Sequence, residues 1–98
     1  MESFSLKYPA SKQVARRAHV GVVGSGDLEI LLVPGRQNHT EFIVRTAADG
    51  FQDLWQNVFE RFVASNDIDA TITINDFGAT PGVVSIRLAQ ALEIAKQK

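Results

Sequence analysis

Hydrophobic residues recur along this chain at two spacings, and each spacing predicts one kind of element. Runs of apolar and β-branched residues, several of them alternating with polar ones, predict half-buried strands. Apolar residues at every third or fourth position predict amphipathic helices. The strand-like segments are residues 4–8, 18–23, 28–33, 41–46 and 67–77, and the helix-like segments are residues 51–64 and 80–98.

The strongest local signal lies between residues 18 and 33. Two strand-like runs flank the sequence Gly24-Ser25-Gly26-Asp27, which is rich in residues that favour tight turns. We therefore expect an exposed β-hairpin with Ser25 at its tip.

The C-terminal segment, residues 80–98, is compatible with two structures. Thr80 followed by Pro81 suits the N-cap and first turn of a helix, and apolar residues follow at helical spacing. The β-branched run at residues 83–86 would also suit the start of a strand. We favour the helix.

The order of these elements predicts the fold class. A strand–helix–strand unit over residues 41–77 normally places its strands parallel through a right-handed crossover, whereas the hairpin must be antiparallel. We expect a single α+β domain over residues 1–98, a two-layer sandwich in which a mixed sheet carries two helices on one face.

Composition excludes several functions. The net charge of -1 predicts no general attraction to nucleic acid or anionic membranes. No apolar run approaches the ~20 residues that a membrane span needs, and the N-terminus does not have the pattern of a signal peptide, so we expect a cytoplasmic protein. The sequence has no cysteine, and its histidines are only His19 and His39, which makes a metal centre improbable.

Ser25 is the candidate for chemistry. Gly24 and Gly26 leave its hydroxyl uncovered, so an approaching enzyme could modify it. Asp27 would either bind backbone N–H groups of the turn or help to orient Ser25. On local evidence alone these residues are typical of ordinary hairpin tips. A catalytic serine is a poor alternative, because a nucleophile needs a general base and His19 lies on the strand that leads into the turn.

Two motifs together resemble a known family. The segments 21–29 and 76–84 are similar to those of the acyl carrier (delta) subunit of bacterial malonate decarboxylase, and the resemblance runs over nearly the whole chain. The related acyl carrier (gamma) subunit of citrate lyase shares the Ser-Gly-Asp hairpin. The segment 76–84 resembles the malonate version and not the citrate one.

The resemblance implies a covalently attached 2'-(5''-phosphoribosyl)-3'-dephospho-CoA arm, linked by a phosphodiester to Ser25, with Gly24, Gly26 and Asp27 in support. It also implies a non-catalytic carrier. A prosthetic-group transferase would install the arm. The partners in the complex would be a malonyl (acyl) transferase subunit and decarboxylase subunits, which convert malonate to acetate and CO2. The absence of cysteine is compatible with a thiol imported on a cofactor.

Three alternatives remain open at this stage. The first is a citrate lyase type of carrier. The second is an unmodified interaction module whose hairpin only docks to another protein. The third is a small enzyme, which would turn over a substrate as the isolated chain.

Overall fold

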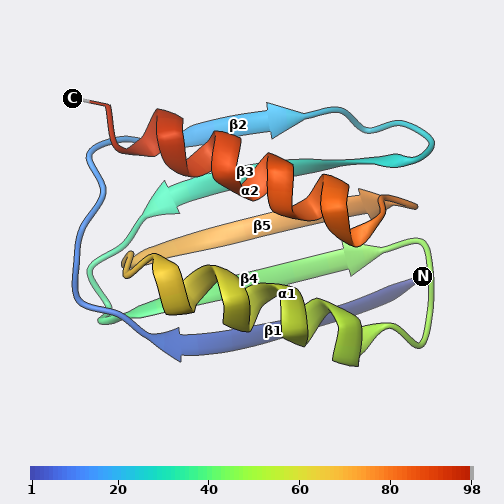
Figure 1. Cartoon of the computed structure of the whole chain (residues 1–98), viewed down its shortest axis with the longest axis horizontal. Helices are drawn as coiled ribbons and strands as arrows, with labels where there is room; N and C mark the ends of the chain where they lie inside the picture. The colour runs from blue at the N-terminus through green and yellow to red at the C-terminus, as the bar shows by residue number, and fades with distance from the viewer. Residues whose placement is uncertain (98) are drawn as a thin grey trace.

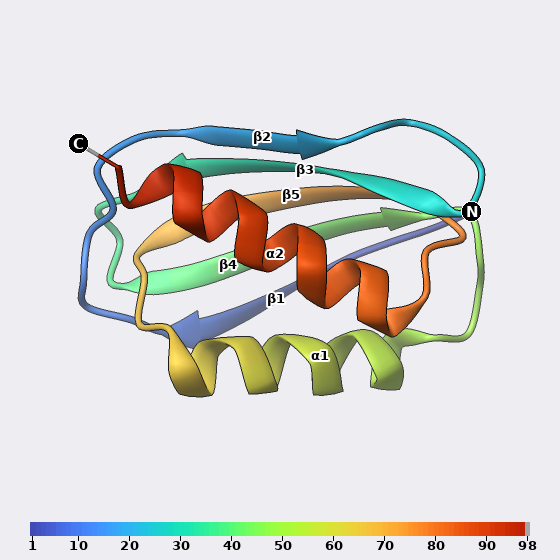
Figure 2. The same cartoon turned by 45° about the horizontal axis from the view of Figure 1, so that its top comes forward.

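The computed structural model describes residues 1–97 and arranges them as a five-stranded sheet with two helices. Along the chain the elements are β1 (Glu2–Pro9), β2 (Ala18–Gly21), β3 (Asp27–Pro34), β4 (His39–Thr46), α1 (Gln52–Ser65), β5 (Ala70–Phe77) and α2 (Pro81–Ala95). Both helices lie on the same face of the sheet (Figures 1 and 2). The predicted α+β sandwich is confirmed.

The sheet is mixed, with the strand order β1-β4-β5-β3-β2. β4 and β5, which precede and follow α1 in the sequence, pair in parallel. All the other neighbouring strands pair antiparallel. Both the parallel unit and the antiparallel pairing of β2 with β3 agree with the expectations from sequence. The carboxyl ends of β4 and β5 therefore meet at one end of the sheet, beside the start of β3 (Figure 1).

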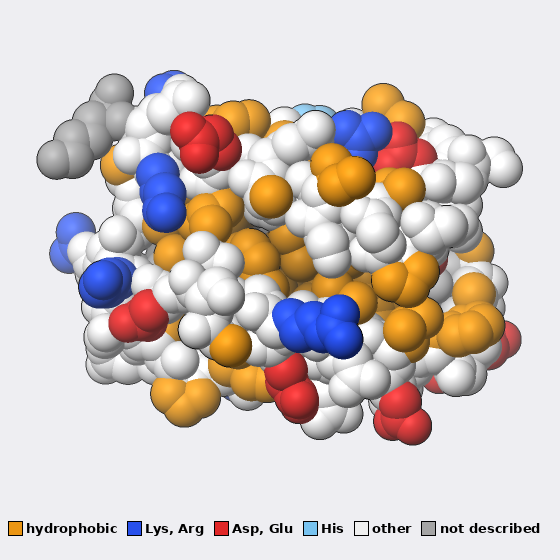
Figure 3. Space-filling view, in the orientation of Figure 1, with side chains coloured by type: hydrophobic (Ala, Val, Ile, Leu, Met, Phe, Trp, Pro, Cys, Tyr) orange, Lys and Arg blue, Asp and Glu red, His pale blue; other side chains and the backbone are white. Residues whose placement is uncertain are grey.

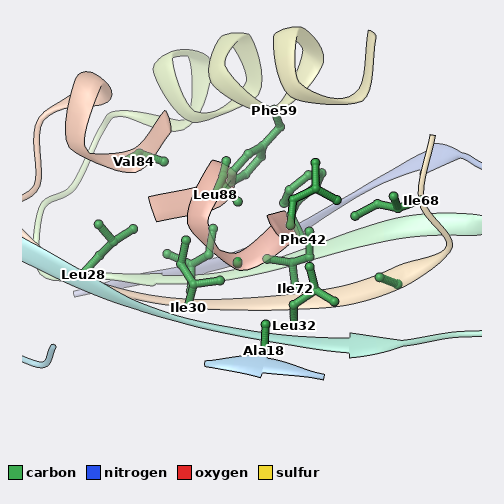
Figure 4. Packing of buried hydrophobic residues seen from close by; sticks show 14 of the residues in the cluster. Ala18, Leu28, Ile30, Leu32, Phe42, Phe59, Ile68, Ile72, Val84 and Leu88 are labelled. Atoms are coloured by element: carbon green, nitrogen blue, oxygen red, sulfur yellow. The ribbon is translucent and has the colours of Figure 1, made fainter. Parts of the chain in front are cut away.

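The core fills the space between the sheet and the helices. In β5 buried and partly exposed residues alternate along the whole strand, as the period-two pattern predicted. Phe42 of β4 stacks on Phe59 of α1 with ring centroids 3.9 Å apart, and Leu88 of α2 is buried beside them (Figure 4). Each such buried side chain contributes about 1.5–3 kcal/mol relative to an exposed one.

The C-terminal segment is a helix from its first turn. The hydroxyl of Thr80 accepts a hydrogen bond from the amide of Val83 at 3.2 Å, and Pro81 occupies the first helical position. Residues 83–86 are helical although they are β-branched, because Val84 is buried against the core. The predicted helix extended to Lys98, which lies outside the described residues.

Strand β2 ends two residues earlier than the sequence predicted, at Gly21 rather than Val23. Gly21 has φ +82°, and a Cβ there would lie 2.0 Å from the carbonyl oxygen of Leu28. The chain therefore turns out of the sheet at a position where only glycine fits. Val22 and Val23 leave the ladder and are exposed, and Ser25 lies in a longer loop than a tight hairpin would have.

Helix α1 buries less of its apolar stripe than the spacing predicted. Trp55 and Phe59 are buried, whereas Phe51 and Leu54, at the start of the helix, are 49% and 42% exposed. The apolar stripe of α1 is thus buried in the middle of the helix and open to solvent at the N-terminal end. That end of α1 adjoins the carboxyl ends of β4 and β5 (Figure 1).

Candidate functional site

Ser25 lies at the tip of a four-residue turn. The amide of Asp27 donates a hydrogen bond to the carbonyl of Gly24 at 3.1 Å, which closes the turn around Ser25 and Gly26. Gly26 has φ +77°, a backbone conformation that glycine adopts readily and other residues disfavour. Ser25 is exposed, as expected, and the glycines on either side leave space around it: a Cβ on Gly26 would meet nothing within 4 Å.

The turn is attached to the sheet on one side. The amide of Gly26 donates to the carbonyl of Phe77 at 2.8 Å, and Asp27 pairs with Phe77 as the first residue of β3. A further bridge joins Asp27 to Gly78. The backbone of the turn is therefore fixed to the end of β5, while the side chain of Ser25 is exposed.

Asp27 is held by an arginine that is 60 residues away in the sequence. The guanidinium of Arg87, on α2, donates from Nε to Oδ1 at 3.2 Å and from Nη2 to Oδ2 at 2.7 Å. Such two-point pairing fixes the orientation of both side chains. The hydrogen bonds from Arg87, and then from the Leu28 amide at 2.7 Å, hold the pKa of Asp27 below its ordinary value.

This arrangement corrects one expectation about Asp27. Its carboxylate does not bind the N–H groups of the turn; it binds the amide of Leu28, inside β3, and Arg87. Sequence reasoning did not identify this role of Arg87. The available signal was its position on α2, about one helical turn beyond the end of the second motif, but no local spacing links Arg87 to Asp27.

Asp76 organises the second motif. Its Oδ2 accepts a hydrogen bond from the hydroxyl of Thr46 at 2.8 Å, and its Oδ1 accepts one from the amide of Ala79 at 2.9 Å. The same carboxylate thus ties the end of β4 to the turn that leads from β5 into α2. Because Gly78 in that turn bridges to Asp27, the two motifs singled out in the sequence form one continuous surface.

Neither histidine is placed to assist Ser25. Nε2 of His19 lies 2.9 Å from Oε2 of Glu29, a contact that lowers the pKa of Glu29. His39 begins β4, at the end of the sheet opposite the Ser25 turn, and is partly buried.

Comparison with known proteins assigns the family. A model of the "Malonate decarboxylase delta subunit (MdcD)" family, an acyl carrier protein family, matches residues 15–95. The chain belongs to this family. The malonate decarboxylase acyl carrier protein of Azotobacter vinelandii is 48% identical over 95% of both chains, and that of Pseudomonas fluorescens (strain SBW25) is 47% identical over the same share.

A solved structure has the same fold. It is a chain of the "Crystal structure of a Pseudomonas malonate decarboxylase hetero-tetramer in complex with malonate", and it superposes with a TM-score of 0.92 at 45% sequence identity, covering 97% of this chain and 99% of that one. The resemblance predicted from the motifs is therefore confirmed. Among residues 1–97 no helix is long and apolar enough to cross a membrane.

Proposed function

We propose that this chain is the carrier subunit of a malonate decarboxylase and that Ser25 is the attachment point of its prosthetic arm. The observation that carries the proposal is the glycine-flanked, exposed Ser25 on a turn whose backbone is fixed to β5. Family membership supports malonate, rather than citrate, as the substrate from which the acyl group derives.

The residues present fit the proposed phosphodiester. Nothing crowds the position: the nearest atom to a Cβ on Gly24 would be Cγ2 of Val22 at 3.7 Å, and Gly26 is open. When attached, a phosphoribosyl-dephospho-CoA arm would supply the thiol that this cysteine-free chain lacks. Malonate would replace the acetyl group on that thiol with release of acetate, and loss of CO2 from malonyl would restore acetyl.

The chain's own contribution is to hold and present the attachment point. Gly26 and Asp27 fix the turn to β5, Arg87 holds Asp27, and the hydroxyl of Ser25 is left accessible to the transferase that installs the arm. A tethered group meets successive partner sites as an intramolecular reactant, which raises its effective concentration. The partners we propose are the prosthetic-group transferase, the malonyl (acyl) transferase subunit and the decarboxylase subunits. That the solved relative is a chain of a malonate decarboxylase hetero-tetramer supports a role within a complex.

The decisive test is the intact mass of the chain purified from cells that also make the transferase, with peptide mapping of residues 18–33. We expect an added mass equal to the phosphoribosyl-dephospho-CoA group on Ser25. Ser25→Ala should stay unmodified and abolish malonate decarboxylation by the assembled complex, with little loss of stability because the side chain is exposed.

Ser65→Ala is the matched control. Ser65 is also exposed, but it ends α1, at the end of the sheet away from the turn, so this variant should be modified and active. An unmodified wild-type chain in the presence of active transferase, or full activity of a complex containing only Ser25→Ala, would contradict the carrier role. Either result would favour an unmodified docking module.

A further inference from the structure

A pocket opens between the N-terminal ends of the two helices, at the same end of the molecule as Ser25. Its volume is about 290 Å³, and its walls are largely apolar, with Leu54, Trp55 and Val58 from α1 and Pro81 and Val84 from α2. Hydrophobic side chains gather between the helices on this face of the molecule (Figure 3). Partly exposed Phe51 and Leu54 thus border a cavity instead of completing the core.

The pocket is continuous with the Ser25 turn. Gly78 lines the pocket, and a Cβ on Gly78 would lie 3.8 Å from the amide nitrogen of Gly26. The amide of Gly26 is in turn bonded to the carbonyl of Phe77. A group attached to Ser25 therefore begins beside Gly26, whose backbone lies against a residue of the pocket wall, Gly78.

The lining chemistry selects the kind of group that fits. Asp76 lines the pocket together with Thr46, and no lysine or arginine among residues 1–97 does so, which disfavours phosphate groups or a malonyl carboxylate. A carboxylate accepts more than two hydrogen bonds, so Asp76 retains capacity beyond those from Thr46 and Ala79. Apolar walls with one acceptor suit a flat, neutral ring that carries N–H donors.

We infer that this pocket holds the adenine of the arm attached to Ser25, an inference that rests on the proposed function. Adenine is the first large flat group along the arm from the phosphodiester, and it is neutral, with an amino group that can donate to Asp76. The volume is near the lower end of the range for ligand pockets, roughly 300–1,000 Å³, so it suits one ring system and not the whole arm.

Holding the base would divide the arm into two parts. The nucleoside half stays against the carrier, and the pantetheine half with its thiol extends toward the partner subunits. A shorter free tether samples a smaller volume, which raises its effective concentration at sites within its reach. The pocket would thereby set the reach of the thioester.

Trp55 reports on this pocket directly, because it is the chain's single tryptophan and lines the pocket wall. We would record its fluorescence in three forms of the full chain, each verified by intact mass: without the arm, with the free-thiol arm, and with the acetylated arm. An adenine in the pocket should quench and shift the emission when the arm is added. Acetylation should then change it little, and the armed chain should unfold at a higher temperature.

Two neighbouring alanines offer a matched pair of variants. Ala48 lines the pocket, whereas Ala47 is exposed and does not. Ala48→Met should fill the pocket and remove the arm-dependent change in Trp55 emission, while its mass shows that Ser25 still carries the arm. Ala47→Met adds the same side chain outside the pocket and should behave as wild type.

The outcomes separate this inference from the carrier role. An armed chain whose Trp55 emission and unfolding temperature match those of the unarmed chain overturns the pocket assignment and leaves the carrier role intact. A change that appears only on acetylation overturns it too, by placing the acyl end in the pocket. A chain that never acquires the arm in the presence of active transferase overturns the carrier role and the inference together.

Discussion

The two ends of the sheet differ in how much they leave accessible to solvent. At the end opposite Ser25, where the connections 10–17, 35–38 and 66–69 meet, side chains bind backbone groups closely. The carboxylate of Asp69 accepts hydrogen bonds from the amides of Gln37 and Asn38 at 3.0 and 2.8 Å, the hydroxyl of Thr40 donates to the carbonyl of Ile68, and Asp67 binds Ser11. At the Ser25 end a turn projects, Asp27 and Arg87 form one ion pair, and a pocket stays open.

The difference separates stability from function. Loop amides donate hydrogen bonds to the buried carboxylate of Asp69 and close the first end, so that its connecting segments become part of the fold. The second end also has a buried carboxylate, Asp76, that accepts the Ala79 amide, but it leaves Ser25 and the pocket accessible, as the proposed attachment point requires. Changes at the closed end should therefore affect unfolding, and changes at the open end should affect modification and presentation of the arm.

The largest effect on stability should come from Asp69→Ala. Asp69 is buried, and its loss leaves the amides of Gln37 and Asn38 without their acceptor, so we expect a loss of about 2–4 kcal/mol in the free energy of unfolding. Urea denaturation measures it. Asp69→Asn keeps one acceptor oxygen and should lose less.

The folded fraction of Asp69→Ala should still accept the arm at Ser25, because the two ends share no side chain. Intact mass after incubation with the transferase checks this expectation. A folded Asp69→Ala chain that is not modified would show that the two ends of the sheet are coupled, and would contradict their assignment to separate roles.

A second prediction compares alanine substitutions at two glycines between β2 and β3, Gly21 at the end of β2 and Gly26 in the Ser25 turn. Both have positive φ, but a Cβ on Gly21 would collide with the Leu28 carbonyl, whereas a Cβ on Gly26 meets open space. Gly26→Ala should cost only the backbone strain, about 1–2 kcal/mol, and Gly21→Ala should cost more because β2 or β3 must also move. Thermal unfolding of the two variants, side by side, measures the difference. Equal losses would mean that the loop relaxes freely around Gly21.

Much of this architecture could be predicted from the sequence, because periodicity reports which face of an element is buried. The alternation in residues 67–77 and the helical stripe of residues 51–64 fixed the type of element and, through the strand–helix–strand rule, the parallel pairing. The end of β2 could not be predicted, since it depends on contact between Gly21 and the carbonyl of Leu28 across the hairpin.

The site was predicted only in part, for a similar reason. Ser25 and its glycines form a local signal that can be recognised within the segment 21–29 alone. The partnership of Asp27 with Arg87, and the pocket between α1 and α2, arise from packing between distant segments. The spacing of Phe51 and Leu54 in the sequence is the same whether these side chains pack against other residues or line a cavity, so the sequence could not distinguish the two cases.

The smallest predicted effect is at the ion pair that joins Arg87 to the turn. Arg87→Gln should lower the unfolding temperature slightly near neutral pH, because Asp27 loses its strongest partner. The folded pKa of Asp27 is lowered below its unfolded value of about 3.9, so this stabilisation is fully present above about pH 5 and is lost as the pH falls through the folded pKa. Thermal melts between about pH 2.5 and 7 should therefore show wild type and Arg87→Gln converging at the acid end.

The same variant tests whether the ion pair also presents Ser25. With Asp27 released, the turn retains the backbone bond from Gly26 to Phe77, so the arm should still attach, but more slowly than in wild type. Arg61→Gln, the same change at an exposed arginine of α1, should alter neither the melts nor the attachment rate. If Arg87→Gln changes stability and leaves attachment at the wild-type rate, the backbone alone positions Ser25. The ion pair would then be a stabilising contact at an end of the sheet otherwise devoted to function.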